Sequence, residues 1–118
     1  NARCAMFYEK AQYKELKKKT SRDCLLCFGK CAGHKGIDEK DPVGILIADK
    51  GIFLERSKGE DAIVLMEHIT AFKQTDNTIT IKTVDESAKK LVLHIHSQKH
   101  RDKGCALLEK YATQLKNN

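Results

Sequence analysis

The stretch that decides the fold is residues 43–96, which read VGILIADKGIFLERSKGEDAIVLMEHITAFKQTDNTITIKTVDESAKKLVLHIH. Apolar and polar residues alternate along it, which is typical of strands that bury one face. Turn residues interrupt the alternation, as at DKG (49–51) and TDN (75–77), and such residues reverse the chain in hairpins. No helical segment lies between the strands, so the order excludes βαβ units and predicts an antiparallel sheet.

The alternation places the strands individually. We predict short strands at residues 23–28, 43–48, 52–55, 62–66, 69–73 and 78–83, and in the run that contains Leu91, Leu93 and Ile95. In TITIKT (78–83), the two isoleucines are expected inward and Thr80 and Lys82 outward. The glycine-rich segment 29–42 is predicted to be a long loop.

Helices are predicted only at the two ends. The first 20 residues contain AMFYEKAQYKELKKK (5–19), which favours an N-terminal helix, and residues 21–96 hold the strands. Residues 97–116 form a second predicted helix, with Ser97 as its N-cap. Its apolar stripe is made by Cys105, Leu108, Ala112 and Leu115. Gly104 weakens this helix by up to about 1 kcal/mol relative to alanine.

Composition limits the class of protein. The 118 residues predict a single domain over 1–118, and the 41% hydrophobic and 32% charged content fits a globular domain. No apolar run approaches the roughly 18 residues of a membrane span, and no signal peptide is visible. The chain begins without Met, so we expect it to be part of a longer protein. Five cysteines, an odd number, favour a reducing cytoplasmic location.

The motifs resemble a known superfold. GIFL (51–54) after a turn, His68 and Ile69 at a strand entry, Asp76 in the next turn and a final helix resemble a phosphotyrosine-binding (PTB) domain or the F3 lobe of a FERM domain. Both belong to the pleckstrin-homology (PH) superfold, and the resemblance covers residues 41–116. It implies an α+β fold, an antiparallel β-sandwich or barrel of about seven strands capped by the C-terminal helix.

The same resemblance implies a function. Such a domain is a non-enzymatic scaffold or adaptor module that binds a peptide or cytoplasmic tail near the inner membrane surface. An extended peptide would add to the strand at 69–73, beside the terminal helix. The implied peptide-binding residues are Ile69, Thr70, Ala71, Phe72, Lys73, Leu108 and Tyr111. For Leu108, the alternative is that it is a core residue and does not contact the peptide. The four arginines, Arg3, Arg22, Arg56 and Arg101, match no phosphotyrosine pocket motif, which favours an unphosphorylated peptide.

A net charge of +6 also favours an acidic partner such as an anionic lipid, a nucleic acid or an acidic peptide, unless the charge serves only to keep a small domain soluble. The alternative function is a PH domain that binds phosphoinositides or an anionic membrane. PH domains often hold inositol phosphates in the loop after the first strand. The candidate lipid-binding residues there are Lys30, His34, Lys35 and Lys40, partly offset by Asp38, Glu39 and Asp41. A second basic group, Lys99, His100, Arg101 and Lys103, lies at the positive end of the terminal helix and suggests an acidic contact, with an ordinary solvent-exposed face as the alternative.

Two sets of residues have metal-ligand chemistry. Cys24, Cys27, Cys31 and His34 are potential zinc ligands, but in a strand Cys24 and Cys27 point to opposite faces. The alternative is that these cysteines are buried as small apolar residues. His94 and His96 could be joined by His100. We predict no metal site and no cofactor, and keep a zinc-stapled nucleic-acid binder as the third hypothesis.

Nucleic acid is an unlikely partner, because no strand interleaves aromatic and basic residues in the way that binding single-stranded nucleic acid requires. An enzyme is not predicted either. The sequence has no glycine-rich phosphate loop, nucleophile elbow or facing carboxylate pair, and nothing orients His34 as a base for Cys27.

Overall fold

The computed structural model describes residues 23–56 and 59–115, and the helix expected within residues 1–20 lies outside these ranges. The described chain forms seven strands followed by one α-helix, which confirms the predicted α+β order. The elements are β1 Leu25–Ala32, β2 Pro42–Ala48, β3 Gly51–Arg56, β4 Ala62–Leu65, the single-turn 3-10 helix η1 Met66–His68, β5 Ile69–Thr75, β6 Thr78–Thr83, β7 Lys90–His94 and α3 Gln98–Tyr111.

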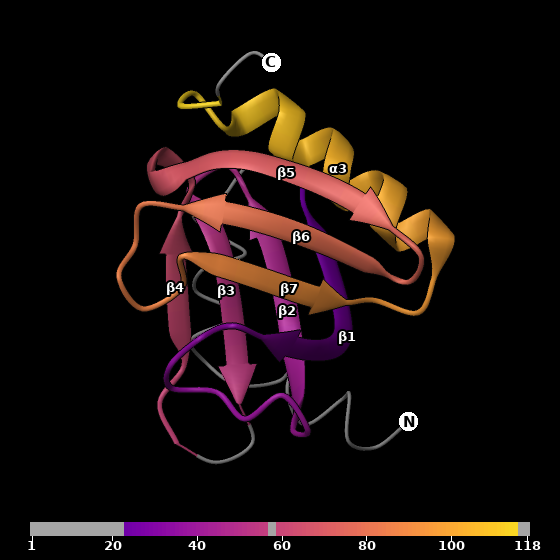
Figure 1. Ribbon diagram of the computed structural model, residues 1–118. Helices are drawn as coiled ribbons and strands as arrows, with labels where there is room; N and C mark the ends of the chain where they lie inside the picture. Colours follow the sequence, from indigo (N-terminus) through magenta and orange to yellow (C-terminus); the bar gives the residue numbers. More distant parts are fainter. Residues whose placement is uncertain (1–22, 57–58, 116–118) are drawn as a thin grey trace.

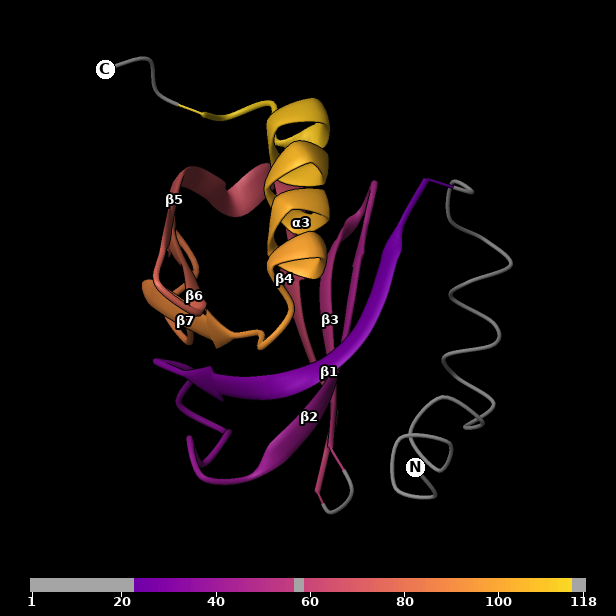
Figure 2. The ribbon, with the colours of Figure 1, turned by 90° about the vertical axis from the view of Figure 1, so that its right-hand side faces the viewer.

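All strand pairs are antiparallel, and the sheet order is β4-β3-β2-β1-β7-β6-β5. The sheet folds into two layers: β2, β3 and β4 lie in one, β5, β6 and β7 in the other, and β1 passes from the first to the second (Figure 1). Viewed from the side, α3 runs along the open side between the layers (Figure 2). This arrangement is a PH-like fold.

β1 joins the two layers because it changes partner along its length. Residues 25–30 pair with β2, whereas Lys30, Cys31 and Ala32 pair with β7. Gly29 lies at the crossing, where a Cβ atom would be 2.3 Å from the carbonyl oxygen of His94. Only a residue without a side chain allows the two strands to approach this closely.

The core lies between the two layers and under α3. It is built by the inward positions of each strand, among them Ile45 and Ile47 of β2 and Ile79 and Ile81 of β6, all fully buried. In β6, Thr80 and Lys82 lie outward, as the alternation predicted. α3 packs closely on this core because Gly104 has no side chain: a Cβ atom there would be 3.2 Å from the Cδ1 atoms of both Ile47 and Ile79.

β2 and β3 also bury their other face. Leu46, Ala48 and Phe53 form a second apolar cluster on it, against which Cys24 and Leu26 pack. This explains why the sequence of β2 is an almost continuous apolar run instead of a clean alternation.

Several predicted boundaries differ from the structure. The first strand continues to Ala32, through glycine-containing sequence expected to be loop, because its second half pairs with β7. The strand expected to end at residue 66 gives way to η1, and β5 continues to Thr75. The terminal helix ends at Tyr111 instead of residue 116, since Ala112 has extended backbone angles (φ −79°, ψ 100°).

Candidate peptide-binding groove beside β5

β5 is the last strand of the sheet and pairs only with β6. Its other edge faces α3, which lies alongside it (Figure 1). In an antiparallel pair, every second residue points its N–H and C=O away from the partner strand. Among the described strands none pairs with this edge of β5, so these groups are available to an added strand.

Side chains, not backbone groups, connect β5 to the first half of α3. The Gln74 Oε1 atom accepts hydrogen bonds from Gln98 Nε2 (2.9 Å) and Arg101 Nε (3.3 Å). The Gln74 Nε2 group donates to Asp102 Oδ1 at 3.2 Å. This network holds the first half of α3 against the Thr75 end of β5.

Arg101 is the centre of that network and is only 5% exposed. Its Nη1 donates to the carbonyl oxygens of Ile95 (2.5 Å) and His96 (2.9 Å), and its Nη2 donates to Gln98 Oε1 (2.8 Å). Nothing in the sequence indicated this burial except the position of a basic residue at the unfavourable end of a helix.

The predicted basic group at the start of α3 is therefore not one surface. Arg101 is internal, and Lys103 forms an ion pair with Asp23, as does Lys110 at 2.9 Å. Hydrogen bonds from Lys103 and then from Lys110 hold the pKa of the Asp23 carboxyl below its usual value. These pairs tie the entry of β1 to α3, and the exposed remainder is Lys99 and His100.

The predicted peptide-binding residues 69–73 all lie on β5, but their environments differ. Ile69 is fully buried, and the Thr70 hydroxyl donates to the Lys82 carbonyl at 3.3 Å, next to a register shift between Ile69 and Ala71. The regular part of the strand is thus 71–75. Ala71 and Phe72 are half-buried and Lys73 is exposed.

The floor of the groove differs from the prediction. Leu108 is fully buried, which agrees with the alternative prediction that it is a core residue. It therefore offers no surface to a peptide. Tyr111 is half-buried, with Lys110 Nζ 5.2 Å from its ring centroid. Phe72, Tyr111, Cys105 and Leu115 all pack on the core while staying partly exposed. The sequence predicts Cys105 and Leu115 on the apolar stripe of the helix but does not predict them as peptide-binding residues.

The candidate lipid-binding residues lie at the end of β1 and in the loop between β1 and β2. Lys30 belongs to β1, and the backbone N–H of Lys40 donates to Asp38 Oδ1 at 2.9 Å within the loop. The His34 Nδ1 atom accepts from the Gly36 N–H at 3.0 Å, so that nitrogen carries no proton. Burial, the largest cause, lowers the pKa of His34. His34 is therefore a neutral side chain rather than a cation at pH 7.

Lys35 lies in a hollow that the prediction did not include. Its backbone N–H donates to the Ser87 carbonyl at 3.0 Å, which joins the β1–β2 loop to the β6–β7 loop. The hollow measures about 310 Å³ and is lined by Gly33, Lys35, Glu86, Ser87, Lys89 and Lys90. Lys89 is paired with Glu86 at 3.4 Å. Three lysines and one glutamate leave this hollow basic.

The zinc hypothesis finds no support in the described part of the chain. Cys27 is in the core, whereas Cys24, which precedes β1, packs against the second apolar cluster on the other side of the sheet, so the two cysteines are directed apart as predicted. Burial raises the pKa of the Cys27 and Cys31 thiols to about 12, so both are neutral. Within residues 23–56 and 59–115, no three His, Cys, Asp or Glu side chains gather as a metal site would need, and this includes His94, His96 and His100.

In the same described residues, no helix has the length and apolar character required to cross a bilayer.

Neither protein-family models nor curated protein sequences give a match to this chain. Among solved structures, the chain is similar to the crystal structure of the FERM and C-terminal domain complex of Drosophila Merlin, with a TM-score of 0.50 and 12% sequence identity. The similarity covers 73% of this chain and 30% of that chain. At this identity the likeness concerns the fold alone, and it agrees with the PH-like arrangement of the seven strands and α3.

Proposed function

We propose that this chain is a non-enzymatic recognition module of the PTB or FERM F3 kind, which binds an extended peptide or cytoplasmic tail as an extra strand on β5. The observation that carries the proposal is the position of β5: it ends the sheet, and α3 lies beside its unpaired edge. Main-chain hydrogen bonds to that edge would provide affinity, and side chains facing α3 would provide selectivity. The PH-like fold, which the chain shares with a FERM-containing structure, supports a recognition module, and we propose that its role is that of a scaffold or adaptor in the cytoplasm.

The other end of the sheet is a poorer acceptor. β4 has only four residues, against seven in β5, and thus offers a shorter ladder. It does expose apolar side chains, with Ile63 50% and Leu65 38% exposed. In the part of the chain that the structure describes, no α-helix borders β4 in the way that α3 borders β5 (Figure 1), so these residues offer no helix beside a strand added there.

The test begins with peptides selected from a random library displayed on phage. A selected peptide is titrated into the isotope-labelled domain, and amide shifts are followed by NMR. We expect the largest shifts at residues 71–75 and in the facing part of α3. Phe72→Asp, which places a charge in the groove, should abolish binding, and Ile63→Asp on β4 is the matched control that should retain it. Circular dichroism of both variants verifies that they fold.

Two results would refute strand addition at β5. The first is that Ile63→Asp prevents binding and Phe72→Asp does not. The second is that shifts gather at β4 while β5 amides stay unchanged. Phe72→Ala, which removes the ring without adding charge, serves if Phe72→Asp does not fold, and it should weaken binding by about tenfold or more.

A second candidate function rests on the basic hollow between the β1–β2 and β6–β7 loops. Lys35, Lys89 and Lys90 could receive a phosphoinositide or another anionic lipid headgroup at a membrane surface. Phosphatidylcholine vesicles with and without phosphatidylserine or phosphoinositide test this by flotation. Salt-sensitive binding that Lys35→Gln with Lys89→Gln removes would support it. Equal flotation with neutral vesicles would exclude it.

A further inference from the structure

The outer face of the β5–β7 layer is basic and contains no carboxylate. β5, β6 and β7 have no aspartate or glutamate anywhere in their sequences. Lys73 on β5, Lys82 on β6 and Lys90 on β7 are all exposed. Their register places Lys82 opposite Lys90 and Lys73 opposite Thr80, so the three lysines lie on the same face of the sheet.

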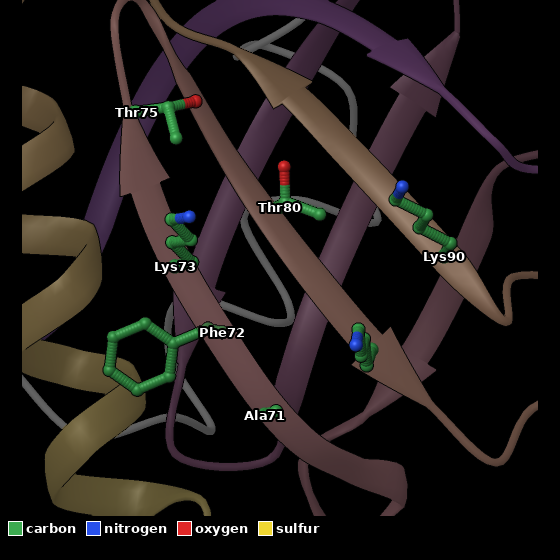
Figure 3. Close-up of a pocket in the computed structure, with 7 residues that line it drawn as sticks. Ala71, Phe72, Lys73, Thr75, Thr80 and Lys90 are labelled. Carbon is green, nitrogen blue, oxygen red and sulfur yellow. The ribbon is translucent and has the colours of Figure 1, made fainter.

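These lysines surround a hollow of about 510 Å³ (Figure 3). It is lined by Ala71, Phe72, Lys73, Thr75, Thr80, Lys82 and Lys90. Like charges directly opposite each other in a sheet repel, and Lys82 and Lys90 form such a pair. Among the described residues, none of the three lysines has an ion-pair partner. Lysine ammonium groups and threonine hydroxyls are together suited to bind a carboxylate.

The position of this lysine face beside the free edge of β5 identifies what it would meet. A strand added to β5 lies about 4.8 Å from it and places every second side chain on the outer face. Those side chains would be neighbours of Lys73, with Lys82 one strand further away. The side chains between them would point inward, on the side to which Phe72 directs its ring toward α3 (Figure 3).

We propose that the peptide bound on β5 carries aspartate or glutamate at alternate positions, received by Lys73 and Lys82, with apolar residues between them facing Phe72 and α3. The proposal rests on strand addition at β5, the function proposed above. It assigns the lysine face to an acidic peptide by charge complementarity. Nucleic acid is a poorer fit, because the one aromatic side chain at this hollow, Phe72, is directed toward α3 and not out over the lysines.

The test is a comparison of selected peptides. The same random peptide library is selected on the natural domain, on Lys73→Glu with Lys82→Glu, and on Lys40→Glu with Lys50→Glu, whose lysines lie outside β5–β7 and whose change in net charge is identical. Peptides from the natural domain and from the control should show Asp or Glu at every second position. Peptides from the first variant should show Lys or Arg there. Replacing the acidic residues of a selected peptide by Gln or Asn should weaken binding about tenfold and reduce its salt dependence.

Each outcome decides between the hypotheses. Selected peptides that shift the β5 amides but have no acidic alternation would overturn this inference and leave strand addition standing. Acidic peptides that shift the lysine face without β5 backbone hydrogen bonds would also overturn it, as would vesicle binding through Lys73 and Lys82 without any acidic preference. A selection in which no peptide perturbs β5 would contradict both proposals.

Discussion

Gln74 of β5 and Arg101 of α3 are joined by a hydrogen bond of 3.3 Å from the arginine Nε to the glutamine Oε1. The same guanidinium also binds the carbonyl oxygens of Ile95 and His96, where the chain leaves β7 and enters α3. One buried cation thus fixes β5, α3 and the end of β7 relative to one another. It thereby holds α3 beside the edge strand to which the proposed peptide would add.

Arg101→Met should destabilise the domain by about 2–3 kcal/mol. The substitution keeps much of the apolar stem but leaves two carbonyl oxygens and Gln74 without their charged donor, and buried acceptors left unpaired are costly. Urea unfolding followed by circular dichroism measures the loss. Lys99→Met on the exposed side of α3 is the control, expected within about 0.5 kcal/mol of the natural domain. An equal, small effect for both variants would show that the Arg101 network does not hold α3 in place.

Gly104→Leu should cost about 2 kcal/mol or more, because the added side chain has to displace Ile47 and Ile79 from positions already close to the helix. Gly104→Ala should be near neutral, since the helix propensity it gains, about 1 kcal/mol, is offset by the 3.2 Å contacts of its Cβ. Thermal unfolding compares the two variants. Toleration of leucine would mean that α3 lies further from the core than described.

Cys27 and Cys31 predict a loss of stability at alkaline pH. Burial raises the pKa of both thiols to about 12 from the usual 9.0, so the unfolded chain releases their protons at lower pH than the folded domain. Stability is therefore full below about pH 9 and falls as pH rises toward 12, on the order of 1–2 kcal/mol per thiol by pH 10.5. Urea midpoints at pH 8 and 10.5 measure the fall. It should be smaller in the double variant Cys27→Ala with Cys31→Ala, and an unchanged fall would assign it to other groups.

The same thiols should resist modification. Iodoacetamide at pH 8 is expected to label Cys24, which is half-buried with ordinary access, before Cys27 and Cys31 in the core. Peptide mapping by mass spectrometry identifies the labelled positions. Rapid labelling of Cys27 or Cys31 in the native domain would contradict their burial.

The sequence predicted the strands and the terminal helix better than it predicted which strands pair. The hairpins at 49–51 and 75–77 follow from local turn chemistry, and the start of α3 follows from Ser97, whose side chain accepts from the His100 N–H as an N-cap does. The extension of β1 to Ala32 could not be predicted, because a glycine such as Gly29 normally indicates a loop. Only the structure shows that Gly29 is needed for the close approach to His94.

The candidate site could be predicted only in part. The choice of 69–73 as the docking strand came from a resemblance, and the strand is at the sheet edge as that resemblance implied. The lysine face could not be predicted from the sequence. The alternation places each lysine outward on its own strand, but only the strand register brings Lys82 opposite Lys90. The burial of Arg101 is not predictable from the sequence, because its partners are the backbone carbonyls of Ile95 and His96, which the fold brings to it, and not an acidic residue.

Strand addition to β5 is tested most directly by nuclear Overhauser contacts between a selected peptide and the domain. If the peptide adds to β5, it should show cross-strand backbone contacts to residues 71–75 and side-chain contacts to Phe72 and Tyr111. Peptide contacts confined to β4, or to the loops around Lys35, with no backbone contact to β5, would contradict it.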